Sequence, residues 1–394
     1  MKIRTQVGIV GAGPAGLMLA HLLRLQGIEC VVVENRSRRY VEERVRAGVL
    51  EQGTVDTLNE TGLGERMRKE GLHHDGVYLR FADRSHRIDF VELTGRAVTV
   101  YGQQEVVKDL IAAALHAGTP IMFESSDVAV HDLTTQQPRI SYRDVAGAAH
   151  DVVCDFIAGC DGFHGVCRPS MPAGHLEFFD RVFPFAWLGV LAESEPVSPE
   201  LIYAHHERGF ALFSMRSPGV TRLYLQCKPV EDMAQWPDDR IWEELQRRLG
   251  NDAPVVATGR ITQKGVTPMR SFVAAPMRHG RLFLAGDAAH IVPPTGAKGM
   301  NLAIADVRVL SKAVGDFYRD GSEDRLNRYS EICLRRVWKG QRFSAWMTSL
   351  LHRIPGQSPF DYRVQLAELD YITGSRAAAT ALAENYVGLP FEAS

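Results

Sequence analysis

The stretch Gly11-Ala12-Gly13-Pro14-Ala15-Gly16 decides the fold, and a second glycine and acid stretch, Gly286-Asp287-Ala288-Ala289-His290, follows it about 270 residues later. A GxGxxG motif brings backbone N–H groups and the start of a helix to a diphosphate. Two nucleotide-type signatures so far apart indicate one extended cofactor that reaches both. We therefore expect FAD rather than a nicotinamide dinucleotide alone.

The residues around the first signature have the order of a dinucleotide-binding βαβ unit. Residues 5–10 read as a buried strand, and the apolar spacing of residues 14–26 predicts the helix that follows. A second apolar run, residues 30–33, ends at Glu34. A carboxylate at this distance from the last motif glycine can bind the 2′-hydroxyl of an adenosine ribose.

Each glycine of the first signature has a separate expected role. Gly11 makes the tight turn, Gly13 lets the backbone approach a diphosphate, and Gly16 lets the helix pack closely on the strand. The alternative is an ordinary glycine-rich turn. The strand, helix, second strand and acid around the motif favour the dinucleotide interpretation.

Composition sets limits on the class of protein. The 394 residues are 45% hydrophobic and 23% charged, which is typical of a soluble globular protein of two or three domains. The formal net charge is −2. Because no strong overall field favours an anionic partner, we expect neither nucleic acid nor a membrane as a partner, and the substrate must be recognised locally.

Six scattered cysteines form no CxxC pair. Their spacing argues against a metal site or a redox dithiol and for reduced, structurally buried thiols. No apolar window of 18 residues and no signal-peptide pattern appear. We therefore predict a cytoplasmic protein without a metal.

The apolar pattern changes several times along the chain and predicts an α/β protein whose Rossmann-like cofactor fold is interrupted by a strand-rich domain. We expect a discontinuous FAD-binding domain, a β-rich substrate-binding domain and a helical C-terminal segment. The expected boundaries are 1–71, 99–180 and 270–350 for the first, 72–98 and 181–269 for the second, and 351–394 for the third.

The second signature follows a buried strand predicted at residues 281–285. From there the Asp287 carboxylate can accept hydrogen bonds from the ribityl hydroxyls of a flavin, although a simple helix N-cap is the alternative. The loop 293–301 then leads into a helix. Its N–H groups would face the N1–C2=O edge of the flavin, where reduction places negative charge.

Two runs of alternating residues on either side of the loop 217–221 predict a β-hairpin. In the predicted register Ser214 lies opposite Tyr224, and Arg216 lies opposite Arg222. A guanidinium with two hydroxyls suits an aromatic carboxylate, because the planar fork binds both oxygens and the hydroxyls reach the remaining lone pairs. The alternative is a solvated arginine on a strand face.

The glycine signatures, together with Asp161-Gly162, resemble those of the single-component flavoprotein aromatic hydroxylases, and the resemblance extends over essentially the whole chain. The strings that carry it are residues 44–53, 160–165, 289–299 and 383–390. It implies an oxidoreductase that hydroxylates 4-hydroxybenzoate to 3,4-dihydroxybenzoate with FAD, NAD(P)H and O2. It also implies a homodimer.

In such an enzyme a flavin C4a-hydroperoxide is the electrophile, and a phenolate attacks it far faster than a neutral phenol. The resemblance implies a proton relay in which Tyr203 contacts the phenol oxygen, Tyr386 lies beyond it and His74 links to solvent. The carbonyl of Pro294 is expected to hold the phenol. The substrate-binding residues implied are Ser214, Arg216, Tyr224, Tyr203, Pro294 and Thr295.

The resemblance also completes the cofactor assignments. The expected FAD contacts are Gly11, Gly13, Gly16, Glu34, Arg46, Gln103, Asp161, Asp287, Gly296, Gly299, Met300 and Asn301. The expected contacts of the nicotinamide donor are Arg44, His164, Arg270, Arg36, Arg38 and Tyr40. The basic segment 36–40 favours NADPH by charge, but Asn35 stands where NADPH-preferring relatives usually have a basic residue, so NADH stays open.

Two alternatives to this function remain at the level of sequence. One is a related flavin hydroxylase for another aromatic acid, such as 3-hydroxybenzoate or a 4-amino analogue. The other is a flavin-binding sensor without catalysis, against which the intact set His74, Tyr203 and Tyr386 argues. His205 replaces an asparagine common in relatives, so the pH dependence of the pocket is expected to differ.

Overall fold

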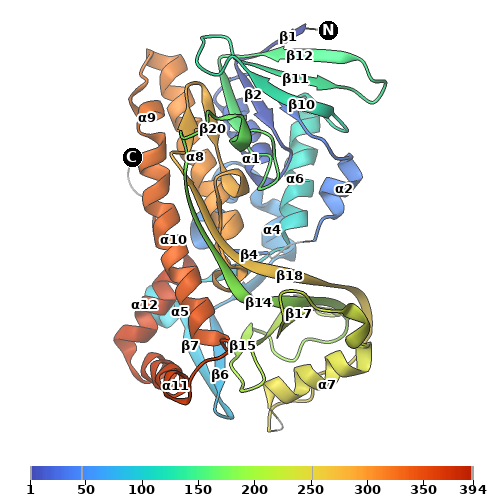
Figure 1. The fold of residues 1–394 in the computed structure, drawn as a ribbon, viewed down its shortest axis with the longest axis vertical. Coiled ribbons are helices and arrows are strands. Elements are labelled where there is room, and N and C mark those ends of the chain that lie inside the picture. The colour runs from blue at the N-terminus through green and yellow to red at the C-terminus, as the bar shows by residue number, and fades with distance from the viewer. Residues whose placement is uncertain (1, 46–47, 251, 392–394) are drawn as a thin grey trace.

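A six-stranded sheet forms the centre of the cofactor-binding half of the protein (Figure 1). The computed structural model describes residues 2–45, 48–250 and 252–391. The strands pair in parallel apart from the β19–β20 pair, as expected for a dinucleotide fold. In sheet order they are β19 (Arg278–His279), β20 (Leu282–Leu284), β13 (Phe156–Gly159), β2 (Val7–Val10), β3 (Cys30–Val33) and β9 (Ile121–Met122).

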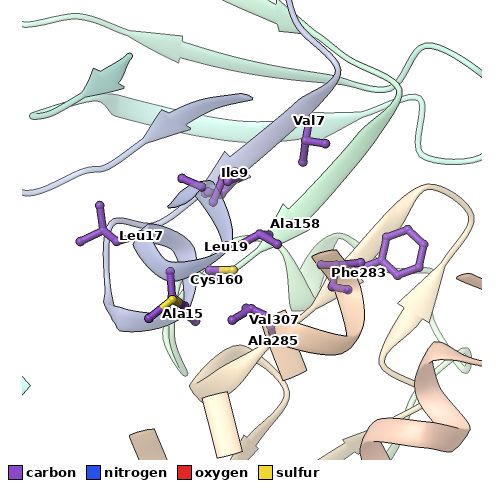
Figure 2. Close-up of a cluster of buried hydrophobic side chains, with 14 of the residues drawn as sticks. Val7, Ile9, Ala15, Leu17, Leu19, Ala158, Cys160, Phe283, Ala285 and Val307 are labelled. Atoms are coloured by element: carbon purple, nitrogen blue, oxygen red, sulfur yellow. The ribbon is translucent and has the colours of Figure 1, made fainter. Parts of the chain in front are cut away.

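Three helices flank this sheet: α1 (Pro14–Leu25), α6 (Gln103–His116) and α8 (Gly299–Asp320). The core lies between them and the strands, with Ile9 of β2, Leu17 of α1 and Val307 of α8 completely or almost completely buried (Figure 2). These strands read as continuous apolar runs because both faces of a parallel sheet are covered. The predicted βαβ unit and the Rossmann-like fold class are confirmed.

An eight-stranded sheet forms the other half. Two of its strands, β14 (Glu177–Glu193) and β18 (Arg260–Ala275), are long enough to run from the cofactor-binding half into this sheet (Figure 1). The predicted boundaries at 180/181 and 269/270 therefore fall inside strands. In sheet order the strands are β21 (His290–Ile291), β18, β14, β17 (Val220–Cys227), β16 (Ala211–Ser217), β15 (Ile202–Ala204), β6 (Gly76–Phe81) and β7 (Arg84–Asp89).

Two small sheets and the remaining helices complete the described chain. The four-stranded sheet contains β1 (Lys2–Arg4), β12 (Ala149–Val153), β11 (Arg139–Arg143) and β10 (Ser126–His131), and the three-stranded sheet contains β4 (Val49–Leu50), β8 (Val98–Val100) and β5 (Leu72–His74). The other α-helices are α2 (Arg38–Glu43), α3 (Gln52–Glu60), α4 (Gly64–Glu70), α5 (Phe90–Thr94), α7 (Asp238–Leu249), α9 (Asp324–Asn327), α10 (Tyr329–Leu351), α11 (Pro359–Gly374) and α12 (Arg376–Val387). The short 3₁₀ helices are η1 (Arg168–Ser170), η2 (Met233–Gln235), η3 (Gly286–Ala288) and η4 (Pro294–Gly296). Within the described ranges, no helix has the length and apolarity that crossing a bilayer requires.

The predicted register of the hairpin β16–β17 is wrong by two residues. Ser214 pairs with Arg222, not with Tyr224, and Tyr224 pairs with Leu212. The strands continue to Ser217 and Val220, so a tight turn replaces the predicted five-residue loop. An even shift leaves each side chain on its predicted face of the sheet.

Arg216 is also not opposite Arg222, because the register shifts between Met215 and Ser217. A β-bulge at such a place takes a residue out of the ladder and re-aims its side chain. The predicted β-rich stretch after Phe183 likewise contains an unpredicted helix, α7, which has a buried apolar face including Ile241 and Leu245.

Candidate functional site

The two glycine signatures meet in space, as one cofactor spanning both would require. A Cβ on Gly286 would lie 3.5 Å from the Cβ of Ala15 in α1 and 3.1 Å from that of Ala303 in α8. The start of α1, the turn η3 and the first turns of α8 thus surround one region. Its walls come from parts of the chain separated by almost 300 residues.

The first signature is also joined to the Asp161-Gly162 motif. Gly11 has φ +103°, and a Cβ there would lie 2.4 Å from the carbonyl oxygen of Cys160. Only glycine fits such a conformation and such a contact. One oxygen of Asp161 accepts the N–H of Cys167 at 2.8 Å, while its buried Oδ1 has no hydrogen-bond partner in the part of the chain that the structure describes. Burial raises the pKa of this carboxyl.

The residues at the start of α1 fit a diphosphate. Gly13 is the N-cap, no side chain caps the helix, and no atom lies within 4 Å of a Cβ built on Gly13. The first N–H groups of the helix are therefore available to an anion. A Cβ on Gly16 would lie 2.0 Å from the Gly11 carbonyl oxygen, so α1 packs closely here, and the cofactor contacts of Gly11, Gly13 and Gly16 stay predictions.

Gly13→Ala is expected to separate cofactor binding from folding. Because Gly13 has φ −75° and open space at its Cβ position, alanine should leave the unfolding temperature of the FAD-free protein unchanged. The methyl group would occupy the approach to the diphosphate, so we expect the dissociation constant of FAD to rise about tenfold or more. Gly374→Ala is the control, because Gly374 at the end of α11 also has open space at its Cβ position, has no left-handed φ and lies outside the signature. Equal FAD affinity in the Gly13→Ala variant and the unmodified protein would contradict the assignment.

The acid after β3 holds the glycine turn as well as being a candidate ribose ligand. Glu34 is buried, and its two oxygens accept the N–H of Ala12 at 2.7 Å and of Arg36 at 2.8 Å. A carboxylate oxygen has a further lone pair for a ribose hydroxyl. Gln103 begins α6 and is half-buried. The predicted contact Arg46 lies outside the described residues.

The side chain of Asn301 holds the loop before α8 in place through four hydrogen bonds. The amide of Asn301 donates to the carbonyls of Val49 and Ala297, and its oxygen accepts from Glu51 N–H and the Thr54 hydroxyl. This side chain is fully bonded, so its backbone is the part that remains for a flavin. Of the other predicted contacts, Gly296 lies in η4, Gly299 and Met300 begin α8, and Asp287 is exposed in η3.

Lys298 is an unpredicted feature of this loop. It is 4% exposed, and its Nζ donates to Glu51 at 2.6 Å, to the carbonyl of Tyr386 at 3.1 Å and to that of Asn385. Burial lowers the pKa of this ammonium group. A single cationic residue within the glycine-containing loop 293–301 is a signal from which Lys298 could have been identified in the sequence. It ties the loop to the C-terminal helix α12.

The candidate carboxylate site contains a guanidinium without a counter-ion. Nε and Nη1 of Arg216 are buried and have no hydrogen-bond partner among the described residues, and burial lowers the pKa of the group. The Tyr224 hydroxyl, which accepts from Arg222 Nε at 3.2 Å, is the nearby polar group. Ser214 is buried on the same strand as Arg216. Burying a cation without a counter-ion destabilises the folded protein unless an anion binds it.

The candidate phenol site is a pair of buried tyrosines. The hydroxyls of Tyr203 and Tyr386 lie 2.6 Å apart, and both rings are at most 2% exposed. Burial raises the pKa of both phenols. Tyr224 and Ala297 pack against the apolar cluster that contains the pair. The hairpin, β15, α12 and the loop before α8 therefore contribute to one apolar cluster.

Three other predicted residues, Pro294, Thr295 and His74, have different surroundings. The Pro294 carbonyl accepts the N–H of Ala297 at 3.0 Å and keeps a second lone pair. Thr295 is buried and accepts from the Thr348 hydroxyl at 2.9 Å. His74 is 1% exposed, and neither ring nitrogen has a hydrogen-bond partner within residues 2–45, 48–250 and 252–391. The structure joins Tyr203 to Tyr386 directly but records no hydrogen bond from either to His74.

Three buried histidines are expected to make the protein acid-labile. Burial lowers the pKa of His74 and of His205 to about 4 and that of His352 to about 3. His352 accepts from Trp187 Nε1 at 2.6 Å and donates through Nδ1 to the Thr348 carbonyl, an arrangement that only the neutral ring provides.

The unfolded chain binds protons at these rings near pH 6.5, so stability should fall as the pH drops from about 6.5 towards 4. For each ring that stays neutral in the folded protein, the free energy of unfolding is expected to fall by about 2 kcal/mol between pH 7 and pH 5. Urea unfolding at both pH values should show a smaller loss for His205→Asn than for the unmodified protein. His116→Asn, at an exposed position, is the control, and an equal loss in both variants would contradict the effect.

The candidates for the nicotinamide donor form two surface groups. In the first, the guanidinium carbons of Arg36 and Arg44 lie 5.2 and 6.0 Å from the ring centre of Tyr40, and Arg38 pairs with Glu42. In the second, Arg270 lies 4.5 Å from the ring centre of Phe163, next to the exposed His164. Arg270 also pairs with Asp180, so a phosphate there would have to compete with a carboxylate.

A dinucleotide fold that brings its two signatures together beside an apolar, largely buried site is the architecture of FAD-dependent monooxygenases. Residues 4–344 match the family described as FAD binding domain, and the chain belongs to this family. The predicted cofactor, FAD, and the predicted class of flavoprotein aromatic hydroxylase are confirmed.

Similarity to individual proteins agrees with this membership. The chain is 51% identical over 392 residues to the p-hydroxybenzoate hydroxylase of Acinetobacter baylyi, covering 99% of this chain and 96% of that protein. It is 28% identical over 309 residues to a 3-(3-hydroxy-phenyl)propionate/3-hydroxycinnamic acid hydroxylase of Mycobacterium sp. (strain JLS), covering 77% of this chain and 52% of that protein. The crystal structure of p-nitrophenol 4-monooxygenase from Pseudomonas putida DLL-E4 superposes with a TM-score of 0.83 and 20% identity, covering 99% of both chains, and shows a shared fold.

Proposed function

We propose that the protein is a 4-hydroxybenzoate 3-monooxygenase, which converts 4-hydroxybenzoate, NAD(P)H, a proton and O2 into 3,4-dihydroxybenzoate, NAD(P)⁺ and water. The observation that carries the choice of substrate is the apolar site with two different polar ends. The unpaired guanidinium of Arg216 lies beside Tyr224, and the hydroxyl pair Tyr203–Tyr386 belongs to the cluster against which Tyr224 packs. The identity with a p-hydroxybenzoate hydroxylase supports the same substrate.

The residues at the carboxylate end bind and orient the ring. Arg216 would supply N–H groups on Nε and Nη1, two nitrogens without partners among the described residues, and the hydroxyls of Ser214 and Tyr224 on the same hairpin would meet the other lone pairs of the carboxylate. The ring centre of Trp187 lies 4.7 Å from that of Tyr224 with the rings tilted at 46°, and Trp187 belongs to the apolar cluster against which Tyr224 packs. A clamp at one end fixes which ring carbon faces the cofactor, and this raises the rate by orientation.

The residues at the phenol end move a proton. Bound FAD supplies the activated oxygen that is transferred to the ring. Tyr203 accepts the proton of the substrate phenol while passing its own to Tyr386, because each hydroxyl both donates and accepts. The resulting phenolate carries charge at the carbon beside the oxygen, where the new hydroxyl is added. Burial keeps both tyrosines neutral, so they transmit the proton and do not hold the charge.

His74 is proposed to complete the relay to solvent through a side-chain or water movement, since its buried nitrogens have no partner in this conformation. Arg36, Tyr40 and Arg44 on one side and His164 and Arg270 on the other are proposed to hold the nicotinamide donor. The basic character of the first group favours NADPH over NADH. We further propose a cytoplasmic homodimer, with all six cysteines free and buried.

Steady-state kinetics test this function. We expect a yellow protein whose oxidation of NADPH rises with 4-hydroxybenzoate and yields one 3,4-dihydroxybenzoate per nicotinamide oxidised. The same assay with NADH in place of NADPH shows which nicotinamide is the better electron donor. Oxidation with 4-hydroxybenzoate that produces hydrogen peroxide but no catechol would reject the proposed reaction.

Two alternatives are separated by the same assay. Coupled turnover with 3-hydroxybenzoate or 4-aminobenzoate above that with 4-hydroxybenzoate would select a hydroxylase for another aromatic acid. The tyrosine pair favours a para-hydroxyl, because only a group at that end of the ring reaches it. Binding of substrate with no change in flavin reduction would select a flavin-binding sensor.

A further inference from the structure

A buried ion pair behind the second cofactor signature has no role in the chemistry described above. His290, the last residue of that signature, is 1% exposed, and Asp306 of α8 is 2% exposed. His290 Nε2 lies 2.7 Å from Asp306 Oδ2, and the same oxygen accepts the N–H of Gly286 at 2.9 Å. One carboxylate oxygen therefore holds both ends of the five-residue signature.

The position of this oxygen links three parts of the fold. Gly286 has φ +62° and starts the turn η3, whose second residue is Asp287, the proposed ligand of the flavin ribityl chain. His290 opens β21, which pairs with Val273 of β18 in the substrate sheet. Asp306 lies on α8, the helix that begins with the loop proposed to face the flavin edge. A substitution at Asp306 would therefore affect the turn η3, the strand β21 and the helix α8 together.

A buried ion pair is an unusual choice for a contact that only stabilises the fold. Burial opposes the charge on His290, but the Asp306 carboxylate outweighs it and raises the pKa of the imidazole, to which Asp287 also contributes. Among the described residues, Cys333 and Tyr329 of α10 and Cys160 after β13 also face Asp306, and burial raises the pKa of all three. Apolar residues of similar volume are usually as stable as a buried ion pair or more stable, so stability alone does not explain it. The hydrogen bond from Gly286 N–H to Asp306 indicates that the pair holds the turn in one orientation.

We propose that Asp306 is a positioning residue for FAD: with His290 as its counter-ion, it fixes the turn Gly286–Ala288 in the geometry that places Asp287 against the cofactor. Asp306 acts through the turn and touches neither FAD nor substrate. His290 orients the Asp306 carboxylate, and a hydrogen bond from Gly286 N–H to a carboxylate oxygen is stronger than one to a neutral acceptor.

The test measures FAD affinity directly. The holoenzyme is diluted and the recovery of free-flavin fluorescence gives the FAD dissociation constant for Asp306→Asn, His290→Gln and the double variant. We expect Asp306→Asn to raise this constant about tenfold or more, His290→Gln to raise it less, and the second change to add little to the first. The absorption spectrum of the bound flavin should change in the Asp306→Asn variant, because the turn no longer fixes the cofactor.

Glu244→Gln is the matched control. Glu244 is also a buried carboxylate, 4% exposed, but it pairs with Arg208 and Arg248 in the substrate half. Glu244→Gln should lower the unfolding temperature and leave the FAD dissociation constant within about twofold. The same result for Asp306→Asn would overturn the proposal and leave the pair a structural one. If Asp306→Asn does not fold, unchanged FAD affinity in His290→Gln overturns it instead.

Discussion

Arg216→Met is expected to abolish productive substrate binding and to make the ligand-free protein more stable. The unmodified guanidinium is buried, its pKa is lowered by burial, and two of its nitrogens lack partners in the chain. Methionine fills a similar space without that cost, so we expect a gain of about 1 kcal/mol in the free energy of unfolding without ligand. Loss of the charged partner should raise the dissociation constant of 4-hydroxybenzoate by about 100-fold or more.

Flavin absorbance titrations and urea unfolding, each with and without 4-hydroxybenzoate, measure the two effects. The methyl ester of the substrate is a chemical control, because it lacks the carboxylate and should bind the unmodified protein and the Arg216→Met variant equally weakly. Arg260→Met is the matched protein control, since Arg260 is exposed on β18 and pairs with Glu193. If Arg216→Met lowers the stability of the ligand-free protein and binds 4-hydroxybenzoate normally, Arg216 is a structural residue and the carboxylate binds elsewhere.

The parts of this fold that follow from local pattern could be predicted from the sequence. The apolar runs before and after Gly11–Gly16 predicted the strand, helix and second strand because both faces of a parallel sheet are buried and a helix has its own period. The meeting of the two signatures also followed, since one cofactor must reach both. The helix α7 was missed because the surrounding strands dominated the interpretation of residues 183–264, although Ile241 and Leu245 have helical spacing.

The hairpin shows what local pattern leaves open. Alternation predicted the faces of Ser214, Arg216 and Tyr224, but the register depended on the turn, and a turn of two residues and a bulge near Arg216 shifted it. Likewise, nothing local pairs His290 with Asp306, because the fifteen residues between them first form a loop and then a helix. Tyr203 and Tyr386 were assigned by family resemblance, and their hydroxyl contact across 183 residues is visible only in three dimensions.

Tyr203→Phe is expected to uncouple the enzyme while leaving its substrate bound. The ring of Tyr203 is 1% exposed and phenylalanine keeps its packing, so the dissociation constant of 4-hydroxybenzoate should change only a few-fold. Without the hydroxyl, the substrate phenol has no route for its proton to Tyr386, and catechol formation should fall about 100-fold. Oxidation of NAD(P)H should continue and release hydrogen peroxide, because cofactor reduction does not need the phenolate.

A substrate with a more acidic phenol separates proton transfer from packing. Fluorine beside the hydroxyl, as in 3-fluoro-4-hydroxybenzoate, lowers the pKa of the phenol, so a larger fraction is already ionised and the relay matters less. The Tyr203→Phe variant should therefore recover part of its coupling with this substrate as the pH rises, whereas a variant with a distorted pocket should not. Tyr101→Phe is the control, since it removes another buried hydroxyl, one that donates to Asp109 at 2.7 Å in the cofactor half. Equal coupling of Tyr203→Phe and Tyr101→Phe with 4-hydroxybenzoate would mean that the substrate loses its proton by another route, with the Tyr203–Tyr386 pair acting only in packing.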